Sequence, residues 1–247
     1  MDWVGIWNTD EGTQGWRFSP GGVATLDADG CRAAYDDLSP DRIVVAGAQA
    51  APADLLPAPV CPGTLGSGPG GIALPALTQQ TPLHRVDGHR LTAIGFLALN
   101  DGWDGVICLP GPVTHWIEVS AGEAVFIQSA LTLRLAAVLG AADATPDQDA
   151  VAQAISRPER MAGALRGAEL SRQPEVALGW LIGAELASAK PLWLGRQVAV
   201  LGQGGADAAY RFALQAQGLP VTVGGAERMA LKGMQVLGDR LGLSARG

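Results

Sequence analysis

Residues 197–223 read QVAVLGQGGADAAYRFALQAQGLPVTV and contain the most regular pattern of the chain. The apolar run at 197–201 predicts a strand, and Gly202-Gln203-Gly204-Gly205 predicts a tight turn after it. The apolar spacing at 206–217 predicts a helix, and the run at 219–223 predicts a second strand. Because strands joined by a helix pair in parallel, this stretch predicts an α/β fold.

The rest of the sequence predicts hairpins first and helices later, which favours a mixed sheet with helices on its faces. Strands are predicted at 3–18 as a hairpin, then at 23–26, 42–46, 105–109, 116–119 and 124–127, and ordered structure is predicted to resume at 72–75. Helices are predicted at 91–99, 129–139, 147–155, 161–166, 178–189 and 226–241. Residues 27–30 predict a turn, and the Ala-, Pro- and Gly-rich residues 47–71 predict irregular structure.

Composition restricts the classes of function. The 247 residues carry a net charge of −7 without a cluster of Lys and Arg, which argues against a nucleic-acid or anionic-membrane partner. Hydrophobic residues make up 48% of the chain, yet no apolar run reaches the ~18 residues of a membrane span. Three cysteines without paired spacing and a start without signal-peptide features predict a cytoplasmic protein with a small soluble substrate.

The glycine turn at 202–205 leaves two interpretations open. Glycines between a strand and a helix let a flat ring or a phosphate approach the backbone, and the N–H groups at the helix start favour an anion. The alternative is a bare tight turn. A nicotinamide dinucleotide site is disfavoured, because Asp207 stands where G-x-G-x-x-G requires its last glycine and no acidic residue ends the second strand.

The first hairpin has the turn NTDEGTQG at 8–15. Asp10 beside Gly12 and Thr13 is a combination that can hold Mg²⁺ and a γ-phosphate. The alternative is a solvated turn built from common turn-forming residues.

Three further residues also allow more than one role. His115 is either an acid–base group or a surface histidine, and Glu185 is either a buried functional carboxylate or a charge on a helix surface. Gly183, inside a predicted helix, marks either close packing or a ligand. His84 and His89 lie five apart without a third ligand and predict no metal site.

Residues 108–119 predict another hairpin, whose loop Pro110-Gly111-Pro112-Val113 leads into Thr114. Glycine and threonine are residue types of a phosphate-binding loop, but this loop contains no Lys or Arg. The loop is therefore a working phosphate site, an altered one, or only a hairpin.

Three segments resemble the 2-dehydro-3-deoxygalactonokinase family: GFLALNDGWDGVICLPGPVTHWIEVSAGEAVFIQSALTLRLAAVL at 95–139, GWLIGAELASAKPLWLGRQVAVLG at 179–202, and YRFALQAQGLPVTV at 210–223. These are sugar-acid kinases of the actin/hexokinase/Hsp70 ATPase superfamily. The resemblance implies a two-lobed, ribonuclease H-like α/β fold of mixed sheets with flanking helices. It implies a shortened N-terminal lobe at 1–104 and a C-terminal lobe at 105–247 that holds adenosine.

The same resemblance implies the reaction. ATP would bind in the cleft between the lobes, and the γ-phosphate of Mg-ATP would pass to the 6-hydroxyl of 2-dehydro-3-deoxygalactonate or a related sugar acid, as part of galactonate catabolism. The partners are then ATP and the sugar acid, with a second copy of the chain as a candidate partner in a homodimer.

The resemblance also implies the residues of the site. The catalytic candidates are Asp10, which would also be the metal ligand, with His115 and Arg134 in place of a missing cation. The cofactor-binding candidates are Gly12, Thr13, Gly111, Thr114, Gly183, Gly202, Gly204 and Gly205.

Departures from the family lie where phosphate, metal and sugar acid would bind. The first strand of the family runs D-W-G-T-T-N-x-R, and alignment on GWRF at 15–18 puts Trp7 at the Asp position. A slipped register puts Asp10 there instead, followed by Gly12 and Thr13. The usual P-G-T-H-[ST]-K-W is PGPVTHW at 110–116, and the usual M-T-G-E-L is LTLRL at 131–135. Because phosphoryl transfer depends on positioning and charge stabilisation, two functions stay open. The first is an active sugar-acid kinase; the second is a catalytically inactive paralogue that binds a ligand or regulates a partner.

Overall fold

The structure, a computed structural model, describes residues 2–48 and 52–243, which form two compact units. Unit 1 consists of the described residues of 1–104, 119–127 and 226–247. Unit 2 consists of residues 105–118 and 128–225. The assignment of nucleotide-binding lobes to 1–104 and 105–247 stays a prediction.

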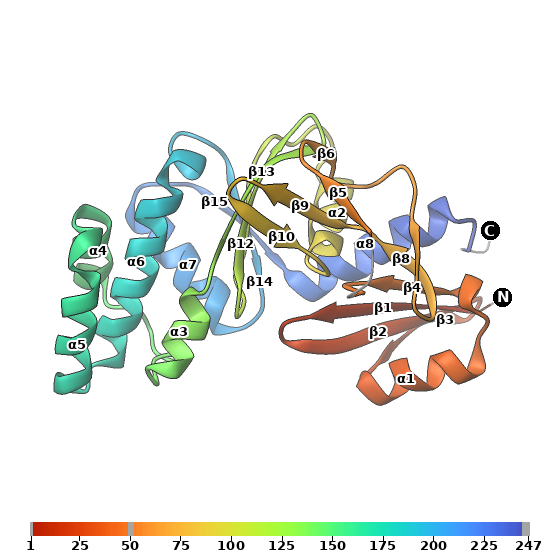
Figure 1. The fold of residues 1–247 in the computed structure, drawn as a ribbon, viewed down its shortest axis with the longest axis horizontal. Helices are drawn as coiled ribbons and strands as arrows, with labels where there is room; N and C mark the ends of the chain where they lie inside the picture. The colour runs from red at the N-terminus through yellow and green to blue at the C-terminus, as the bar shows by residue number, and fades with distance from the viewer. Residues whose placement is uncertain (1, 49–51, 244–247) are drawn as a thin grey trace. The chain divides into compact units, whose positions relative to one another are not determined.

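A six-stranded mixed sheet begins unit 1, with the strand order β3-β2-β1-β4-β8-β7 (Figure 1). Strands β1, β2 and β3 form antiparallel pairs, β4 lies parallel to both β1 and β8, and β7 is antiparallel to β8. The bounds are Trp3–Thr9 for β1, Gly12–Ser19 for β2, Gly22–Leu26 for β3, Ile43–Ala46 for β4, Gly66–Gly68 for β7 and Gly71–Leu74 for β8. The predicted strands at 3–18, 23–26 and 42–46 are therefore confirmed, and the ordered structure predicted to resume at 72–75 is strand β8.

Helix α1 (Ala28–Asp37) packs on this sheet through Cys31 and Ala34. The turn predicted at 27–30 is wrong, because Asp27 is the N-cap of this helix and its Oδ1 accepts a hydrogen bond of 2.8 Å from Gly30 N. A short 3-10 helix, η1 (Pro40–Arg42), follows it.

The segment predicted to be irregular contains short strands in its described residues, and it is followed by a strand pair that the sequence did not predict. Strands β5 (Ala53–Leu55), β9 (Ala76–Gln80) and β10 (Leu83–Val86) form a three-stranded sheet of order β10-β9-β5. Strand β6 (Ala58–Pro59) pairs antiparallel with β13 (Glu123–Ala130). Prolines and glycines interrupt the apolar pattern here, so the strand signal of this segment is weak.

Two helices complete unit 1, namely α2 (Arg90–Leu99) and α8 (Ala226–Arg240). They cross at glycines: a Cβ atom added to Gly95 would lie 1.7 Å from Met229 O, and one added to Gly233 would lie 2.2 Å from Leu91 O. Only glycine allows two backbones to approach this closely. The helix predictions at 91–99 and 226–241 are confirmed.

The fully buried guanidinium of Arg90 ties the first turn of α2 to the loops around β5 and β6. It donates to the carbonyl oxygens of Val60, Pro75 and Pro59 and pairs with Asp54 at 2.7 Å. Burial lowers the Arg90 pKa, and Asp54 opposes that change.

Unit 2 contains the parallel strands that the stretch at 197–223 predicted. Strands β15 (Val221–Gly225), β14 (Val198–Gly202), β11 (Gly105–Leu109) and β12 (Thr114–Ser120) are neighbours in that order, with β14 parallel to both β11 and β15. Helix α7 (Gly205–Ala216) connects β14 to β15. Every residue of β11 and β14 is buried, as expected for central parallel strands.

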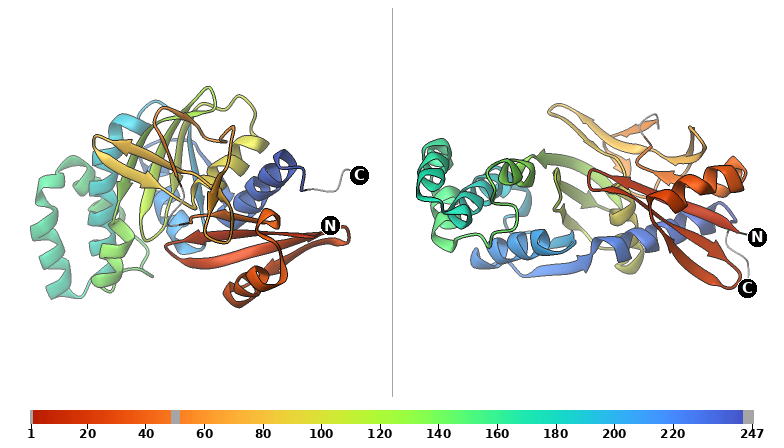
Figure 2. Two further views of the ribbon diagram at one scale, coloured as in Figure 1. Left: turned by 45° about the vertical axis from the view of Figure 1, so that its right-hand side comes forward. Right: turned by 90° about the horizontal axis from the view of Figure 1, so that it is seen from below.

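The remaining helices of unit 2 lie side by side in both figures (Figures 1 and 2). They are α3 (Thr132–Val138), α4 (Gln148–Ser156), α5 (Met161–Ser171) and α6 (Pro174–Trp193), with the 3-10 turn η2 (Pro158–Arg160) before α5. The helix predicted at 129–139 is shorter than expected, because residues 129 and 130 continue strand β13.

Candidate functional site

The end of β1 in unit 1 holds Trp7 where the resemblance implied an aspartate. Trp7 is 2% exposed, and its Nε1 donates a hydrogen bond of 2.9 Å to Gly88 O. Its ring stacks near Trp16 and meets the His89 ring edge-on, with centroids 6.3 Å apart. Trp7 is therefore a core residue of unit 1.

The turn that follows β1 presents its carboxylates at the surface. Asp10 and Glu11 are exposed, and Thr13 Oγ1 donates to Asn8 Oδ1 at 2.7 Å. Partial burial and the charge of Asp10 raise the pKa of Glu11. Gly12 has a φ of 141° and opens β2. Asp10, Gly12 and Thr13 thus lie on one turn, as predicted.

A second acidic residue, Asp87, was not selected in the sequence analysis and belongs to a segment that lies against this turn. Residues 87–89 join β10 to α2, and a Cβ atom on Gly88 would lie 1.9 Å from Asn8 O. His89 is buried, and that burial lowers its pKa although the charges of Asp10 and Asp87 oppose the change. At neutral pH the imidazole is therefore uncharged and lies within the field of two carboxylates. The only signal in the sequence was the polar stretch HRVDGH.

Across residues 2–48 and 52–243, no three or more His, Cys, Asp and Glu side chains gather as a metal site would require. Mg²⁺ does not need such a cluster, because it usually keeps several waters and binds through one or two carboxylates plus substrate phosphates. The Asp10 turn has the chemistry for that mode of binding.

In unit 2, the loop 110–113 joins β11 to β12 and is anchored by Thr114. Gly111 is buried, and Thr114 is fully buried with its Oγ1 2.9 Å from the hydroxyl of Tyr210. Pro112 supplies no backbone N–H donor to the loop. The Thr114 hydroxyl is therefore bonded inside the unit.

Glu185 on α6 is a buried carboxylate, so the helix-surface interpretation is wrong. Its Oε1 accepts from Trp116 Nε1 and its Oε2 from the Tyr210 hydroxyl, both at 2.6 Å, and Thr132 also bonds to it. Burial raises the Glu185 pKa, while these three donors oppose the change. Burial is also the largest cause that raises the pKa of Tyr210 and of Cys108, and the charge of Glu185 is the second cause.

His115 and Arg134 lie apart from this network. His115 alternates with Thr114 along β12, and its Nδ1 is 2.8 Å from Ser129 Oγ. It is 6% exposed, so the surface-histidine interpretation is wrong. Arg134 is exposed on α3. Their proposed role as replacement cations stays a prediction.

The glycine turn lies between β14 and α7, as predicted. A Cβ atom on Gly202 would lie 2.6 Å from Asp207 Cβ, so glycine is needed for the tight return into the helix. Gly204 has a φ of 65° and caps α7, while Gly205 begins the helix. A Cβ atom on either of these two would meet nothing within 4 Å, so their surroundings are open.

Gly183 in α6 lies against α4. A Cβ atom there would lie 2.5 Å from Val151 O and 2.6 Å from Ala154 Cβ. Close helix packing therefore accounts for this glycine, and its contact with a cofactor stays a prediction.

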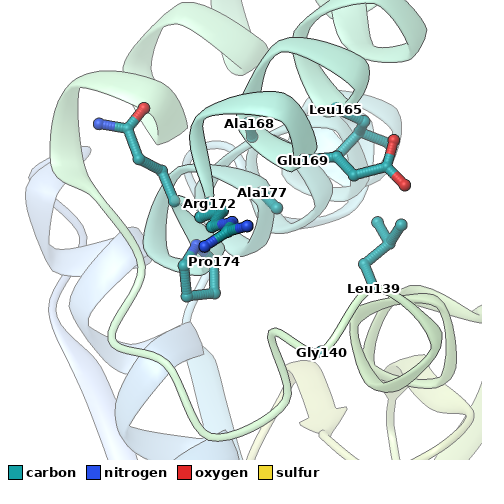
Figure 3. A pocket seen from close by; sticks show the side chains of 9 residues that line it. Leu139, Gly140, Leu165, Ala168, Glu169, Arg172, Pro174 and Ala177 are labelled. Atoms are coloured by element: carbon teal, nitrogen blue, oxygen red, sulfur yellow. The ribbon is translucent and has the colours of Figure 1, made fainter.

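A hollow of about 230 Å³ in unit 2 lies between the end of α3, α5 and the start of α6 (Figure 3). Its lining is Leu139, Gly140, Leu165, Ala168, Glu169, Arg172, Gln173, Pro174 and Ala177. None of the predicted site residues belongs to this lining.

A family model described as 2-keto-3-deoxy-galactonokinase matches residues 51–237. Among solved structures, a protein of Sinorhizobium meliloti named for 2-dehydro-3-deoxygalactonokinase is similar, with a TM-score of 0.77 and 19% identity over 96% of this chain and 98% of the other. A search of curated proteins finds no significant relative.

Two more distant structures have a similar fold. The activator of 2-hydroxyisocaproyl-CoA dehydratase from Clostridium difficile, solved with bound ADPNP, has a TM-score of 0.52 and 11% identity over 98% and 96% of the two chains. Component A of (R)-2-hydroxyglutaryl-CoA dehydratase from Acidaminococcus fermentans has a TM-score of 0.51 and 10% identity over 94% and 96%. The predicted two-lobed, actin/hexokinase-like α/β fold is confirmed. No helix of the described chain is both long and apolar enough for a membrane span.

Proposed function

We propose, because this chain belongs to the 2-keto-3-deoxy-galactonokinase family, that it binds Mg-ATP and phosphorylates 2-dehydro-3-deoxygalactonate or a related sugar acid. The 6-hydroxyl oxygen of the sugar acid forms a bond to the γ-phosphorus, and the bond from that phosphorus to the bridging oxygen breaks. ADP leaves, and the hydroxyl proton passes to a base on the protein.

The observation that most supports this reaction is the close approach of residues 87–89 to the Asp10 turn in unit 1, where a Cβ atom on Gly88 would lie 1.9 Å from Asn8 O. Asp87 is partly exposed at the start of α2, where a substrate hydroxyl can reach it, so it is our candidate for the base. His89 is buried and uncharged, so it adds no positive charge to the one that Arg85 brings to the carboxylate. Arg85 pairs with Asp87 at 2.7 Å and holds its orientation.

Asp10 is the candidate for the magnesium ligand. Its turn also presents the exposed Gly12 and the hydroxyl of Thr13, which suit the approach of phosphate oxygens. When bound, the ion would neutralise charge on the transferred phosphoryl group. The glycine turn of unit 2, with open space at Gly204 and Gly205, is the candidate adenosine contact.

The altered residues predict a slow kinase. Loop 110–113 contains no cation, and Pro112 removes one backbone donor. Loss of a single positioned donor typically lowers kcat by about 10²–10³. We therefore expect turnover well below that of a family member with P-G-T-H-[ST]-K-W in this loop.

The test is a coupled ADP-release assay with Mg-ATP and 2-dehydro-3-deoxygalactonate, run on the wild type, Asp87→Asn and Arg32→Gln. We expect ADP release that depends on the sugar acid and falls by about 10² or more in Asp87→Asn, as for loss of a general base. Arg32→Gln changes an exposed charge on α1 and serves as the control. Equal rates for wild type and Asp87→Asn would contradict the assignment of the base.

A second candidate function is binding of nucleotide or sugar acid without transfer. The observation that favours it is Trp7, which is buried at the position where the resemblance implied the metal-organising aspartate. Calorimetric titration with a non-hydrolysable Mg-ATP analogue, with and without the sugar acid, separates the two. Binding without ADP release supports the second function, and binding with release supports the kinase. No heat up to millimolar nucleotide contradicts both nucleotide-dependent functions.

A further inference from the structure

The buried carboxylate of Glu185 connects the two segments of unit 2 that are the candidate nucleotide contacts. Loop 110–113 leads directly into Thr114, and the glycine turn leads into α7, which carries Tyr210 in its second turn. Tyr210 lies between the two, because its hydroxyl contacts Thr114 Oγ1 at 2.9 Å and Glu185 Oε2 at 2.6 Å.

The direction of these hydrogen bonds follows from the number of protons. The Tyr210 hydroxyl has one proton and donates it to Glu185, so it accepts from the Thr114 hydroxyl. Glu185 also accepts from Trp116, two residues along β12 from Thr114. Strand β12 is therefore bound to the carboxylate directly through Trp116 and indirectly through Tyr210.

We propose that Glu185 and Tyr210 are positioning residues that hold loop 110–113 and the glycine turn in one fixed arrangement for a nucleoside triphosphate. This inference rests on the proposed nucleotide site of unit 2. Neither side chain touches the nucleotide. Tyr210 and Thr114 are fully buried, so their polar atoms act only through the backbone segments that they join.

A purely structural role is less suited to this network. Buried polar networks contribute little net stability compared with apolar residues of the same shape, but they select one arrangement of the elements that they connect. Four elements of unit 2 meet at this carboxylate, namely β12, α3, α6 and α7. Two of them begin at the candidate phosphate and adenosine contacts.

The first measurement is hydrogen exchange of the backbone amides in wild type, Tyr210→Phe and Tyr35→Phe. Tyr35 is the only other tyrosine of the sequence and lies in unit 1, so it provides a chemically identical control. In Tyr210→Phe we expect faster exchange in 108–116 and 201–210 together, with no change in Tyr35→Phe. Faster exchange in 201–210 alone would overturn the proposal.

The second measurement is calorimetric titration of the same proteins with a non-hydrolysable Mg-ATP analogue and with adenosine. We expect Tyr210→Phe to weaken the triphosphate about fivefold to tenfold, the effect of about one net hydrogen bond, and to leave adenosine affinity unchanged. An equal loss for both ligands, or no loss for either, would overturn the proposal. If the wild type binds neither ligand, the proposed nucleotide function fails, and the exchange result alone decides whether the two segments are coupled.

Thr114 provides a second pair of variants in case Tyr210→Phe does not fold. Thr114→Ser keeps the hydroxyl that donates to Tyr210, whereas Thr114→Val removes it with little change of shape. We expect coupled faster exchange in Thr114→Val and recovery of the wild-type pattern in Thr114→Ser. Identical behaviour of the two variants would overturn the proposal.

Discussion

Among the residues that the structure describes, each unit buries one charged side chain, and the two charges are satisfied in different ways. Arg90 in unit 1 donates to three backbone carbonyls and pairs with one half-exposed carboxylate, Asp54. Glu185 in unit 2 accepts from three side chains, those of Trp116, Tyr210 and Thr132.

The difference separates a residue that shapes the fold from one that adjusts a site. Carbonyl acceptors exist at every residue, so Arg90 fixes the course of the loops around it whatever their side chains are. Side-chain donors can be removed one at a time by substitution, so the network of Glu185 can be altered without changing the backbone. We therefore expect stability to depend most on Arg90 and ligand affinity to depend most on Glu185 and its partners.

The largest expected effect is that of Arg90→Met. It leaves three carbonyl oxygens without the donor that Arg90 supplies, and removal of one member of a buried charged group typically costs about 3–5 kcal/mol. The free energy of unfolding from urea titration measures the loss. Arg17→Met is the control, since Arg17 pairs with Asp37 at the surface and such pairs contribute about 0–1 kcal/mol. Equal losses in the two variants would remove the distinction drawn for Arg90.

The second effect compares two glycines of unit 2. Gly183→Ala forces a methyl group against Val151 O at 2.5 Å, and overpacking of this kind costs about 1–3 kcal/mol of unfolding free energy. Gly205→Ala meets nothing within 4 Å, so stability changes by less than ~1 kcal/mol while binding of a nucleotide at the turn weakens. Thermal unfolding and calorimetric titration give both quantities. Weaker nucleotide binding by a fully stable Gly183→Ala variant would instead place Gly183 at the ligand.

The third and smallest effect concerns pH. Glu185 has a raised pKa in the folded protein, so between its ordinary value of 4.5 and that raised value the folded state holds more protons than the unfolded state. The stabilisation that this group contributes is complete at pH values below its ordinary pKa. It is lost as the pH rises through its pKa in the folded protein, with a slope of at most about 1.4 kcal/mol per pH unit. Urea titrations across this pH range should show that the free energy of unfolding depends less steeply on pH in Glu185→Gln than in the wild type. The same slope in both proteins would contradict the raised pKa.

The parts of the fold that were predictable are those where local pattern and tertiary packing agree. Strands β11 and β14 are continuous apolar runs, and the glycine turn that begins α7 follows β14 directly in the sequence. Helix α1 was missed because Asp27 is both a turn-forming residue and an N-cap, and only the packing of Cys31 and Ala34 on the sheet decides between them.

The candidate site was less predictable, because its decisive contacts join residues far apart in the chain. Tyr210 follows Thr114 by 96 positions, and no local pattern shows that their hydroxyls meet. The approach of Gly88 and His89 to the end of β1 depends in the same way on how β10 and α2 pack on that strand. Residue type identified Thr114 and Glu185 as candidates, but only the structure shows that they belong to one network.

Helix α8 has a consequence for the order in which the protein forms on the ribosome. Its Gly238 packs against the Trp3 ring and its Met234 against Gly5, so the last helix covers the first strand. All of unit 2 is synthesised between these two partners. Unit 2 can therefore begin to fold on the growing chain before α8 exists. The face of β1 that α8 covers stays uncovered until residues more than 200 positions later have been made. The side of the Trp3 ring that meets Gly238 is therefore covered only after α8 has been made.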